Sequence, residues 1–290
     1  MEPFDFGFLA EQPEWWSGNT VKRLGKSLAA GSPLPENSEM IMNWYHNLAI
    51  QTARAAEEFA RGLFELDQSP TYLNSSFRLK STATIADKIN RTNVQLSTMW
   101  DFAGARLTAN VLHDDLRRLS KQLREHLEAH GFKTDEKDYI DDPQRGYRAL
   151  HVLITGSAGN VELQLRTLLQ SEWANTFEKL ADITGRKIRY DESFQPTDPN
   201  LAKIAENLYL ISENIHTLES EQSRTARNYR TALRNLAPPH GVPISPEVHK
   251  LRAEALSALY EIEVVAGKQA AATLDMLGSL RNVKNSLQAI

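Results

Sequence analysis

The chain has 290 residues, of which 41% are hydrophobic and 24% charged, so a globular fold with a sizeable core is expected. Lysine and arginine number 33 against 37 acidic residues, and this net charge of −4 excludes a generally basic nucleic-acid-binding protein. The absence of cysteine excludes disulfides, thiolate metal sites and a cysteine nucleophile. With no secretory signal and no apolar run of about 18 residues, we expect a cytoplasmic protein that does not bind membranes.

The first 70 residues are expected to form an arm followed by two helices. Asn19 can cap a first helix over residues 20–30, because asparagine is a preferred N-cap residue. A second and longer helix, capped by Asn37 or Ser38, is expected to run to about Leu66, since its apolar residues recur at helical spacing.

The middle of the chain alternates strand-like and helix-like segments. Residues 77–80 alternate apolar and basic side chains, as a half-buried strand does, and Ser81 or Thr82 can cap a helix through Asn90. The expected elements that follow are a strand over 102–111, a helix over 114–130, strands over 147–154 and 161–167, and a helix over 168–184. This mixed order predicts an α+β or α/β domain with a partly antiparallel sheet.

The last part of the chain is expected to be helical. Asp198 can cap a helix that has Pro199 in its first turn, and a final helix is expected from Pro246 onward. Apolar residues in the first of these helices are spaced three and four apart, at Leu201, Ile204, Leu208, Ile211, Ile215 and Leu218. This heptad-like seam is typical of a helix packed on its own domain, and it is also compatible with a homo-oligomer formed through the C-terminal helices.

Two alternating segments within residues 137–167 flank a glycine-rich turn and carry side chains typical of a ligand site. Because strand side chains alternate between faces, a one-residue slip in pairing would move each of them to the opposite face. Burying the apolar residues of both segments therefore predicts one polar face that comprises Tyr147, His151, Glu162, Gln164 and Arg166. The alternative is a solvated sheet face without a function.

Basic residues upstream of this hairpin are expected to hold phosphate groups. Residues 74–110 contain five basic and only two acidic side chains. Arg78 and Lys80 project from one side of their strand, and Lys88 and Arg91 lie three apart on the helix that follows. The N-terminus of that helix also attracts anions, so a polyphosphate cradle is expected, with a merely solvated basic surface as the alternative.

Two carboxylates are candidates for a magnesium site. Asp101 precedes a strand-like segment and is expected to join Glu162 of the polar face. Mg²⁺ prefers one or two protein carboxylates together with phosphate oxygens of the substrate, which suits this pair.

Five segments resemble the synthetase domain of the RelA/SpoT family of nucleotide pyrophosphokinases. They are FRLKSTATIADKINR (77–91), MWDFAGARL (99–107), KDYIDDPQRGYRALH (137–151), VELQLRT (161–167) and WANTFEKLAD (173–182). The resemblance spans about residues 40–190 and rests on the order and spacing of the segments. It implies a nucleotidyltransferase-like α+β fold with a mixed five-stranded sheet flanked by helices.

The sequence pattern is expected to divide the chain into three parts. These are an N-terminal arm with helices (1–70), a synthetase domain (71–195) and a C-terminal helical extension (196–290).

The resemblance implies that pyrophosphate passes from ATP to the 3′-hydroxyl of an acceptor, with Mg²⁺ assisting and AMP leaving. GTP or GDP is the expected acceptor, which would give a (p)ppGpp-type alarmone. A first alternative is a toxin that modifies the 3′ end of tRNA and is countered by an antitoxin protein. A second alternative is a non-catalytic nucleotide-binding module.

The same resemblance implies a role for each candidate on the ATP side. Arg78 and Arg106 would sandwich the adenine, while Lys80, Lys88 and Arg91 would hold the triphosphate.

The resemblance implies that Asp101 and Glu162 bind the metal, with Glu162 also near the attacking hydroxyl of the acceptor as a candidate general base. Tyr147 would stack on the acceptor base, and His151 would contact its phosphate or ribose. Gln164 and Arg166 would support this face.

The loop before Tyr147 departs from the family pattern. The usual loop reads Pro-Lys-x-Asn-Gly-Tyr, whereas this chain has Pro143-Gln144-Arg145-Gly146-Tyr147, which is one residue shorter. The loop lysine and asparagine are missing and Arg145 is present, so Arg145 is counted among the acceptor-binding candidates. Because this loop lies on the acceptor side, the altered sequence keeps the tRNA alternative open.

Overall fold

The computed structural model describes residues 5–66, 71–236 and 246–288. These residues form two compact units. The first unit comprises the described residues of 1–111, 115–142 and 148–168, and the second comprises those of 112–114, 143–147 and 169–290. The three-part division expected from the sequence is not tested by these packing units and stays a prediction.

Sixteen helices and strands follow one another in the described residues. In chain order they are η1 (Gly7–Leu9), α1 (Gly18–Ala30), α2 (Ser38–Leu66), β1 (Leu73–Leu79), α3 (Thr82–Thr92), η2 (Leu96–Thr98), η3 (Trp100–Phe102), β2 (Ala103–Ala109), α4 (His113–Ala129), β3 (Lys133–Asp138), β4 (Leu150–Gly156), β5 (Gly159–Thr167), α5 (Leu168–Thr184), η4 (Arg186–Arg189), α6 (Pro199–Leu236) and α7 (Pro246–Gln288). The η elements are short 3₁₀ helices.

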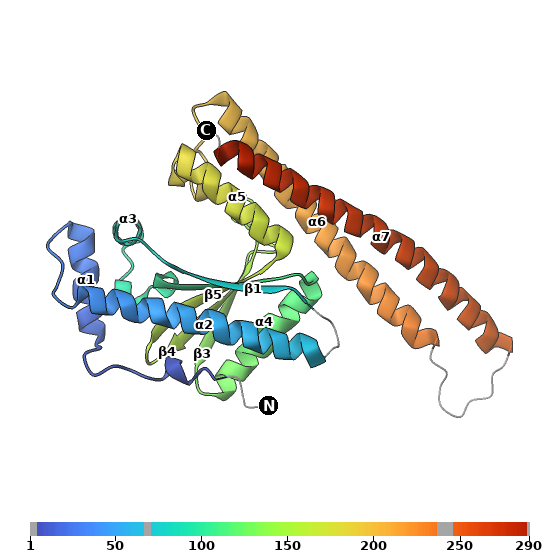
Figure 1. Cartoon of the computed structure of the whole chain (residues 1–290), viewed down its shortest axis with the longest axis horizontal. Helices are drawn as coiled ribbons and strands as arrows, with labels where there is room; N and C mark the ends of the chain where they lie inside the picture. The colour runs from blue at the N-terminus through green and yellow to red at the C-terminus, as the bar shows by residue number, and fades with distance from the viewer. Residues whose placement is uncertain (1–4, 67–70, 237–245, 289–290) are drawn as a thin grey trace. The chain divides into compact units, whose positions relative to one another are not determined.

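The first unit is built on a mixed five-stranded sheet in the order β1-β2-β5-β4-β3 (Figure 1). The two central strands, β2 and β5, are parallel, and all other neighbours are antiparallel. A parallel pair needs a long crossover, which α4, β3 and β4 supply between β2 and β5. The predicted α+β class and mixed five-stranded sheet are confirmed.

One face of the sheet is apolar and packs against α2 and α4. On β5 the buried side chains of Val161, Leu163 and Leu165 alternate with half-buried or charged neighbours. They share a core with fully buried leucines of α4 and with the buried face of α2. Each fully buried side chain of this kind is worth about 1.5–3 kcal/mol, so a slipped register of β5 would be strongly disfavoured.

Most helix boundaries agree with the sequence predictions. The boundaries of α2 and α5 are as expected, and Ser81 caps α3 by accepting a hydrogen bond from the backbone N–H of Thr84. Residues 67–70, which were expected to end α2, lie outside the described residues. The predicted cap of α1 is wrong, because Ser17, not Asn19, is extended and accepts a hydrogen bond from the N–H of Thr20 at 3.1 Å.

Two strand predictions need correction. The edge strand β3 was not predicted, because it has no buried side chain and alternates only between exposed and half-buried ones. Tyr147 was expected in a strand, but β4 begins at Leu150 and Tyr147 closes a turn with Gln144. The hairpin between β4 and β5 turns at residues 157–158, as expected.

The second unit is dominated by the antiparallel pair of long helices α6 and α7, which run side by side (Figure 1). Gln222 of α6 bonds to Thr273 of α7, and Gln269 of α7 bonds to Thr225 of α6, which sets the opposite directions. Within the predicted seam of α6, Leu208 and Ile215 are buried in the monomer. This favours packing within the chain, and a homo-oligomer stays a prediction. No helix among the described residues is long and apolar enough to cross a bilayer.

We expect Gly156→Ala to destabilise the first unit by about 1–3 kcal/mol, because overpacking a tight contact forces the backbone to shift. A Cβ at Gly156 would lie 2.3 Å from the carbonyl oxygen of Leu9, which already accepts a hydrogen bond from the N–H of Ala158. Urea unfolding measures the change. The control is Gly18→Ala, where no atom lies within 4 Å of the added carbon. Equal stability of the two variants would contradict this packing.

Candidate active site

The polar face of the sheet is centred on Gln164 of β5. The register places Arg106 of β2 opposite Gln164 on one side and His151 of β4 opposite it on the other. The Gln164 carbonyl oxygen accepts hydrogen bonds from Arg106 Nε at 3.2 Å and from Arg166 Nη2 at 2.6 Å. Its amide nitrogen donates to Glu162 Oε1 at 2.6 Å. The structure thus brings together four of the five residues expected on this face.

Glu162 is held as a carboxylate by its neighbours. Burial alone would raise its pKa, but the hydrogen bond and charge of His151, the Gln164 amide and the charge of Lys88 lower the pKa from 4.5 to about 2. His151 Nδ1 lies 3.5 Å from Glu162 Oε1. A general base works best with a pKa near the working pH, so this environment suits a metal ligand or an orienting acceptor better than a base.

A second carboxylate, Asp101, is paired with two lysines. Its Oδ2 lies 2.6 Å from Lys88 Nζ and 3.2 Å from Lys80 Nζ. Its Oδ1 is buried and accepts no hydrogen bond within the described part of the chain. Lys88 also stabilises the ionised form of Glu162, so its ammonium group acts on both carboxylates.

The two carboxylates, which both interact with Lys88, carry oxygen donors of the kind that Mg²⁺ prefers. The described residues contain no group of three or more His, Asp or Glu side chains able to hold a metal by themselves. Mg²⁺ commonly takes one or two carboxylates and completes its shell with phosphate oxygens and water. The unsatisfied Oδ1 of Asp101 is an oxygen donor suited to that role.

Arg78 and Arg106 lie on the same face in adjacent strands. Arg78 of β1 is opposite Gly104 of β2, and Ser76 of β1 is opposite Arg106. Gly104 has no side chain, and a Cβ there would come 3.2 Å from the Arg78 carbonyl oxygen. Arg91 is exposed in the last turn of α3, three residues after Lys88.

Tyr139 is a residue of this face that the sequence reasoning did not single out. Its ring meets the His151 ring edge-on, with 4.8 Å between the centroids. Burial, followed by the negative charge of Glu162, raises the pKa of Tyr139. Tyr139 lies in one of the segments that carry the resemblance. It directly follows β3, an edge strand that the sequence pattern does not predict.

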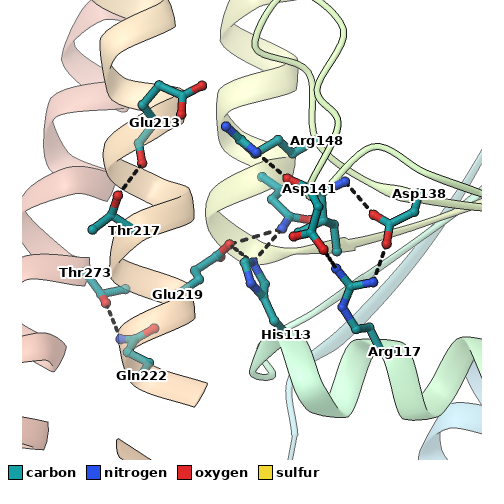
Figure 2. A network of polar contacts seen from close by, with 12 residues as sticks. His113, Arg117, Asp138, Asp141, Arg148, Glu213, Thr217, Glu219, Gln222 and Thr273 are labelled. Carbon is teal, nitrogen blue, oxygen red and sulfur yellow. Dashed lines mark hydrogen bonds and ion pairs between the residues drawn. The ribbon is translucent and has the colours of Figure 1, made fainter. Parts of the chain in front are cut away.

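The segment that carries Tyr139 is fixed by arginines. Figure 2 shows Arg117 of α4 bonded to both Asp138 and Asp141. Burial would raise the pKa of Asp138, but the hydrogen bond from Arg117 and the N–H of Ile140 lower it. The buried Arg148 donates to the Ile140 carbonyl oxygen. The residues immediately before and after Tyr139 in the sequence are therefore both fixed by arginines.

The loop residues Arg145 and Tyr147 belong to the second unit. Arg145 (φ 52°) and Gly146 (φ 77°) are both left-handed, and the N–H of Tyr147 donates to the Gln144 carbonyl oxygen at 3.0 Å. These are the features of a type I′ turn. A non-glycine residue in this region costs on the order of 1–3 kcal/mol, so Arg145 is strained.

Residues 77–182 match the family model described as "Region found in RelA / SpoT proteins". Residues 77–182 are a RelA/SpoT-family domain. All the candidate side chains on the sheet face fall inside this RelA/SpoT domain, as does the loop with Arg145 and Tyr147.

Two curated relatives match part of this chain. "Uncharacterized protein Rv1366" of Mycobacterium tuberculosis and "Uncharacterized protein Mb1401" of Mycobacterium bovis are each 39% identical over 184 residues, or 61% of this chain. The chain spans 63% of the length of each relative.

Solved structures share the fold at lower identity. Small alarmone synthetase 1 from Bacillus subtilis, bound to its product pppGpp, matches with a TM-score of 0.52 and 24% identity over 66% of this chain and 96% of that one. A GTP pyrophosphokinase family protein from Streptococcus pneumoniae matches with a TM-score of 0.50 and 21% identity over 71% and 100% of the two chains. At this identity the likeness establishes the fold of the RelA/SpoT domain.

Glu162 is expected to stabilise the fold at neutral pH and to lose that effect in acid. Its folded-state pKa is lowered from 4.5 to about 2, so the unfolded state binds more protons between these values and stability falls as the pH falls. A shift of this size corresponds to at most about 3.5 kcal/mol. Between pH 6 and pH 3, the free energy of unfolding measured with urea should fall more for the wild type than for Glu162→Gln. An equal fall in both proteins would contradict the lowered pKa of Glu162 in the folded state.

Proposed function

We propose that this chain is an ATP pyrophosphokinase that makes a (p)ppGpp-type alarmone from GTP or GDP. The observation that carries the proposal is the place of Lys88 in a RelA/SpoT-family domain: its ammonium group pairs with Asp101, and its charge lowers the pKa of Glu162. A lysine beside metal-type carboxylates suits a polyphosphate and its magnesium ion.

On the donor side, the proposal assigns the phosphates of ATP to Lys80, Lys88 and Arg91. The two lysines neutralise Asp101 when no nucleotide is present, so they are held at the place where phosphate charge would arrive. The guanidinium groups of Arg78 and Arg106 would flank the adenine. Gly104, the residue opposite Arg78, has no side chain. Phosphoryl-type transfer depends mainly on such positioning and charge stabilisation.

In the proposed reaction, the 3′-hydroxyl oxygen of the acceptor forms a bond to the β-phosphorus of ATP. The bond from that phosphorus to the α–β bridging oxygen breaks, and AMP leaves with the electron pair. Mg²⁺, held by Asp101 and Glu162, would supply charge neutralisation on the phosphates. Glu162 would orient the hydroxyl as a hydrogen-bond acceptor, which its low pKa of about 2 allows, and the proton would pass to solvent.

On the acceptor side, Tyr147 would stack on the base, and His151 and Tyr139 would form the wall beside Glu162. Stacking on an aromatic ring is worth about 1–3 kcal/mol per base. The preference for a guanine nucleotide draws support from small alarmone synthetase 1, a protein of the same fold that was solved with its product pppGpp.

A second candidate function keeps the chemistry and changes the acceptor to the 3′ end of tRNA, with an antitoxin protein as partner. The shortened loop with Gln144 and Arg145 favours it, since that loop lies on the acceptor side. The non-catalytic nucleotide-binding alternative fits less well, because a pure binding module does not need Asp101 and Glu162 together.

Purified protein incubated with γ-labelled ATP and Mg²⁺ should transfer the label to GTP or GDP and release AMP. Parallel reactions with GTP, GDP and bulk tRNA identify the acceptor by chromatography and gel electrophoresis. Label on tRNA alone would replace the first function by the second. Nucleotide binding without AMP release, for every acceptor, would contradict both.

Glu162→Gln should lower kcat by about 10²–10³-fold, as expected for the loss of a group that holds the metal ion and orients the attacking hydroxyl. The matched control is Glu125→Gln, since Glu125 is an exposed carboxylate on α4. The variant should retain a native circular dichroism spectrum at neutral pH. Wild-type turnover by the Glu162→Gln variant would contradict the role proposed for Glu162.

Asp101→Asn should raise the Mg²⁺ concentration needed for half-maximal activity by about tenfold, which is typical when a metal site loses a supporting interaction. The KM for ATP at saturating Mg²⁺ should change less than this. An unchanged Mg²⁺ requirement would show that Asp101 serves only to neutralise Lys80 and Lys88.

A further inference from the structure

The side chain of Arg145 points into the second unit and anchors its own turn there. Its Nε donates to the Ile188 carbonyl oxygen at 3.2 Å, and its Nη2 donates to the Phe194 carbonyl oxygen at 3.5 Å. The guanidinium carbon lies 4.8 Å from the centroid of the Tyr209 ring on α6, within the range of a cation–π interaction. Each of these contacts lies within the second unit.

The next residue, Gly146, is also seated on the helices of that unit. Its carbonyl oxygen accepts a hydrogen bond from Ser212 Oγ of α6 at 2.5 Å. A Cβ at this position would lie 2.9 Å from the Trp173 ring and 3.2 Å from the Tyr209 ring. Trp173 is buried and donates its indole N–H to the Leu208 carbonyl oxygen at 2.6 Å, so the surface beneath the glycine is itself fixed.

These contacts explain how an arginine is tolerated at a left-handed position. Type I′ turns favour Asn-Gly, because asparagine and glycine adopt positive φ at little cost. This chain has Arg145 in the place where such an asparagine would stand, and its strain persists because the side chain is held at three points. The side-chain contacts of Arg145 therefore stabilise the left-handed conformation that asparagine would adopt by its own preference.

We propose that Arg145 is a positioning residue: by anchoring its turn on Tyr209 of α6, it sets the place where Tyr147 meets the acceptor. Arg145 itself does not touch the acceptor. Because Tyr209 lies beyond residues 77–182, the C-terminal helix α6 takes part in acceptor selection. This inference rests on the proposed function.

The test compares Arg145→Asn with wild type, since asparagine tolerates a left-handed backbone but lacks the three side-chain contacts that hold the turn in place. Tyr209→Leu removes the ring beneath the guanidinium group, and Tyr209→Phe keeps it as the conservative control. Leu210→Ala, at an exposed neighbour on α6, is a second control.

The first readout is steady-state kinetics with ATP and the acceptor varied separately. If the competent arrangement of the turn falls to about a tenth of the population, the acceptor KM rises about tenfold while the KM for ATP stays constant. Arg145→Asn and Tyr209→Leu should both show this split, and their double variant should be no worse than either. Tyr209→Phe and Leu210→Ala should behave as wild type.

The second readout is amide hydrogen exchange of the Tyr147 N–H, which is bonded to the Gln144 carbonyl oxygen. Exchange should be faster in Arg145→Asn and Tyr209→Leu than in wild type and both controls. Unchanged exchange would overturn the anchoring. Faster exchange with an unchanged acceptor KM, or equal rises in both KM values, would overturn the role in acceptor selection. If wild type transfers no pyrophosphate at all, the proposed function fails, and exchange alone decides whether the anchor exists.

Discussion

The position of β5 between β2 and β4 is the constraint on which the polar face depends. The buried side chains of Val161, Leu163 and Leu165 fix the register of β5. That register in turn leaves Glu162, Gln164 and Arg166 on the opposite face, with Arg106 and His151 beside Gln164. The amide of Gln164 then joins the arginines to the carboxylate in one hydrogen-bonded row. Core packing and site geometry therefore have a single cause.

Both carboxylates of this site have cationic neighbours, which explains how they stay ionised in a partly buried place. Lys80 and Lys88 oppose Asp101, and His151 and Lys88 oppose Glu162. Burying an unpaired charge is costly, so these pairs keep the face stable without a ligand. In the proposed function, a nucleotide with its metal ion would bring both signs of charge to these groups.

The sequence predicted those parts of the fold that carry a strong periodic or capping signal. The apolar alternation of β4 and β5 and the regular stripe of α2 were sufficient for their type and approximate bounds. The edge strand β3 has no buried side chain, so its alternation gave no signal, and Tyr139 was overlooked with it. From the sequence, Asp101 and Glu162 are expected to hold the metal and Lys88 to hold the triphosphate, and the contact of Lys88 with Asp101 is visible only in the structure.

The behaviour of Arg145 could not be read from the sequence, because it depends on residues far along the chain. The shortened loop suggested a residue that faces the acceptor, whereas its guanidinium group lies against Tyr209 and two carbonyl oxygens. A left-handed arginine also runs against the local preference for asparagine or glycine. Long-range contacts of this kind override local propensity, and only the three-dimensional arrangement reveals them.

The most direct test of the central claim is ³¹P nuclear magnetic resonance of a reaction containing the protein, ATP, GDP and Mg²⁺. The account predicts that AMP accumulates in equal amount to a new pyrophosphoryl group attached to the 3′ position of the acceptor. Formation of ADP and inorganic phosphate instead, with GDP unchanged, would contradict it.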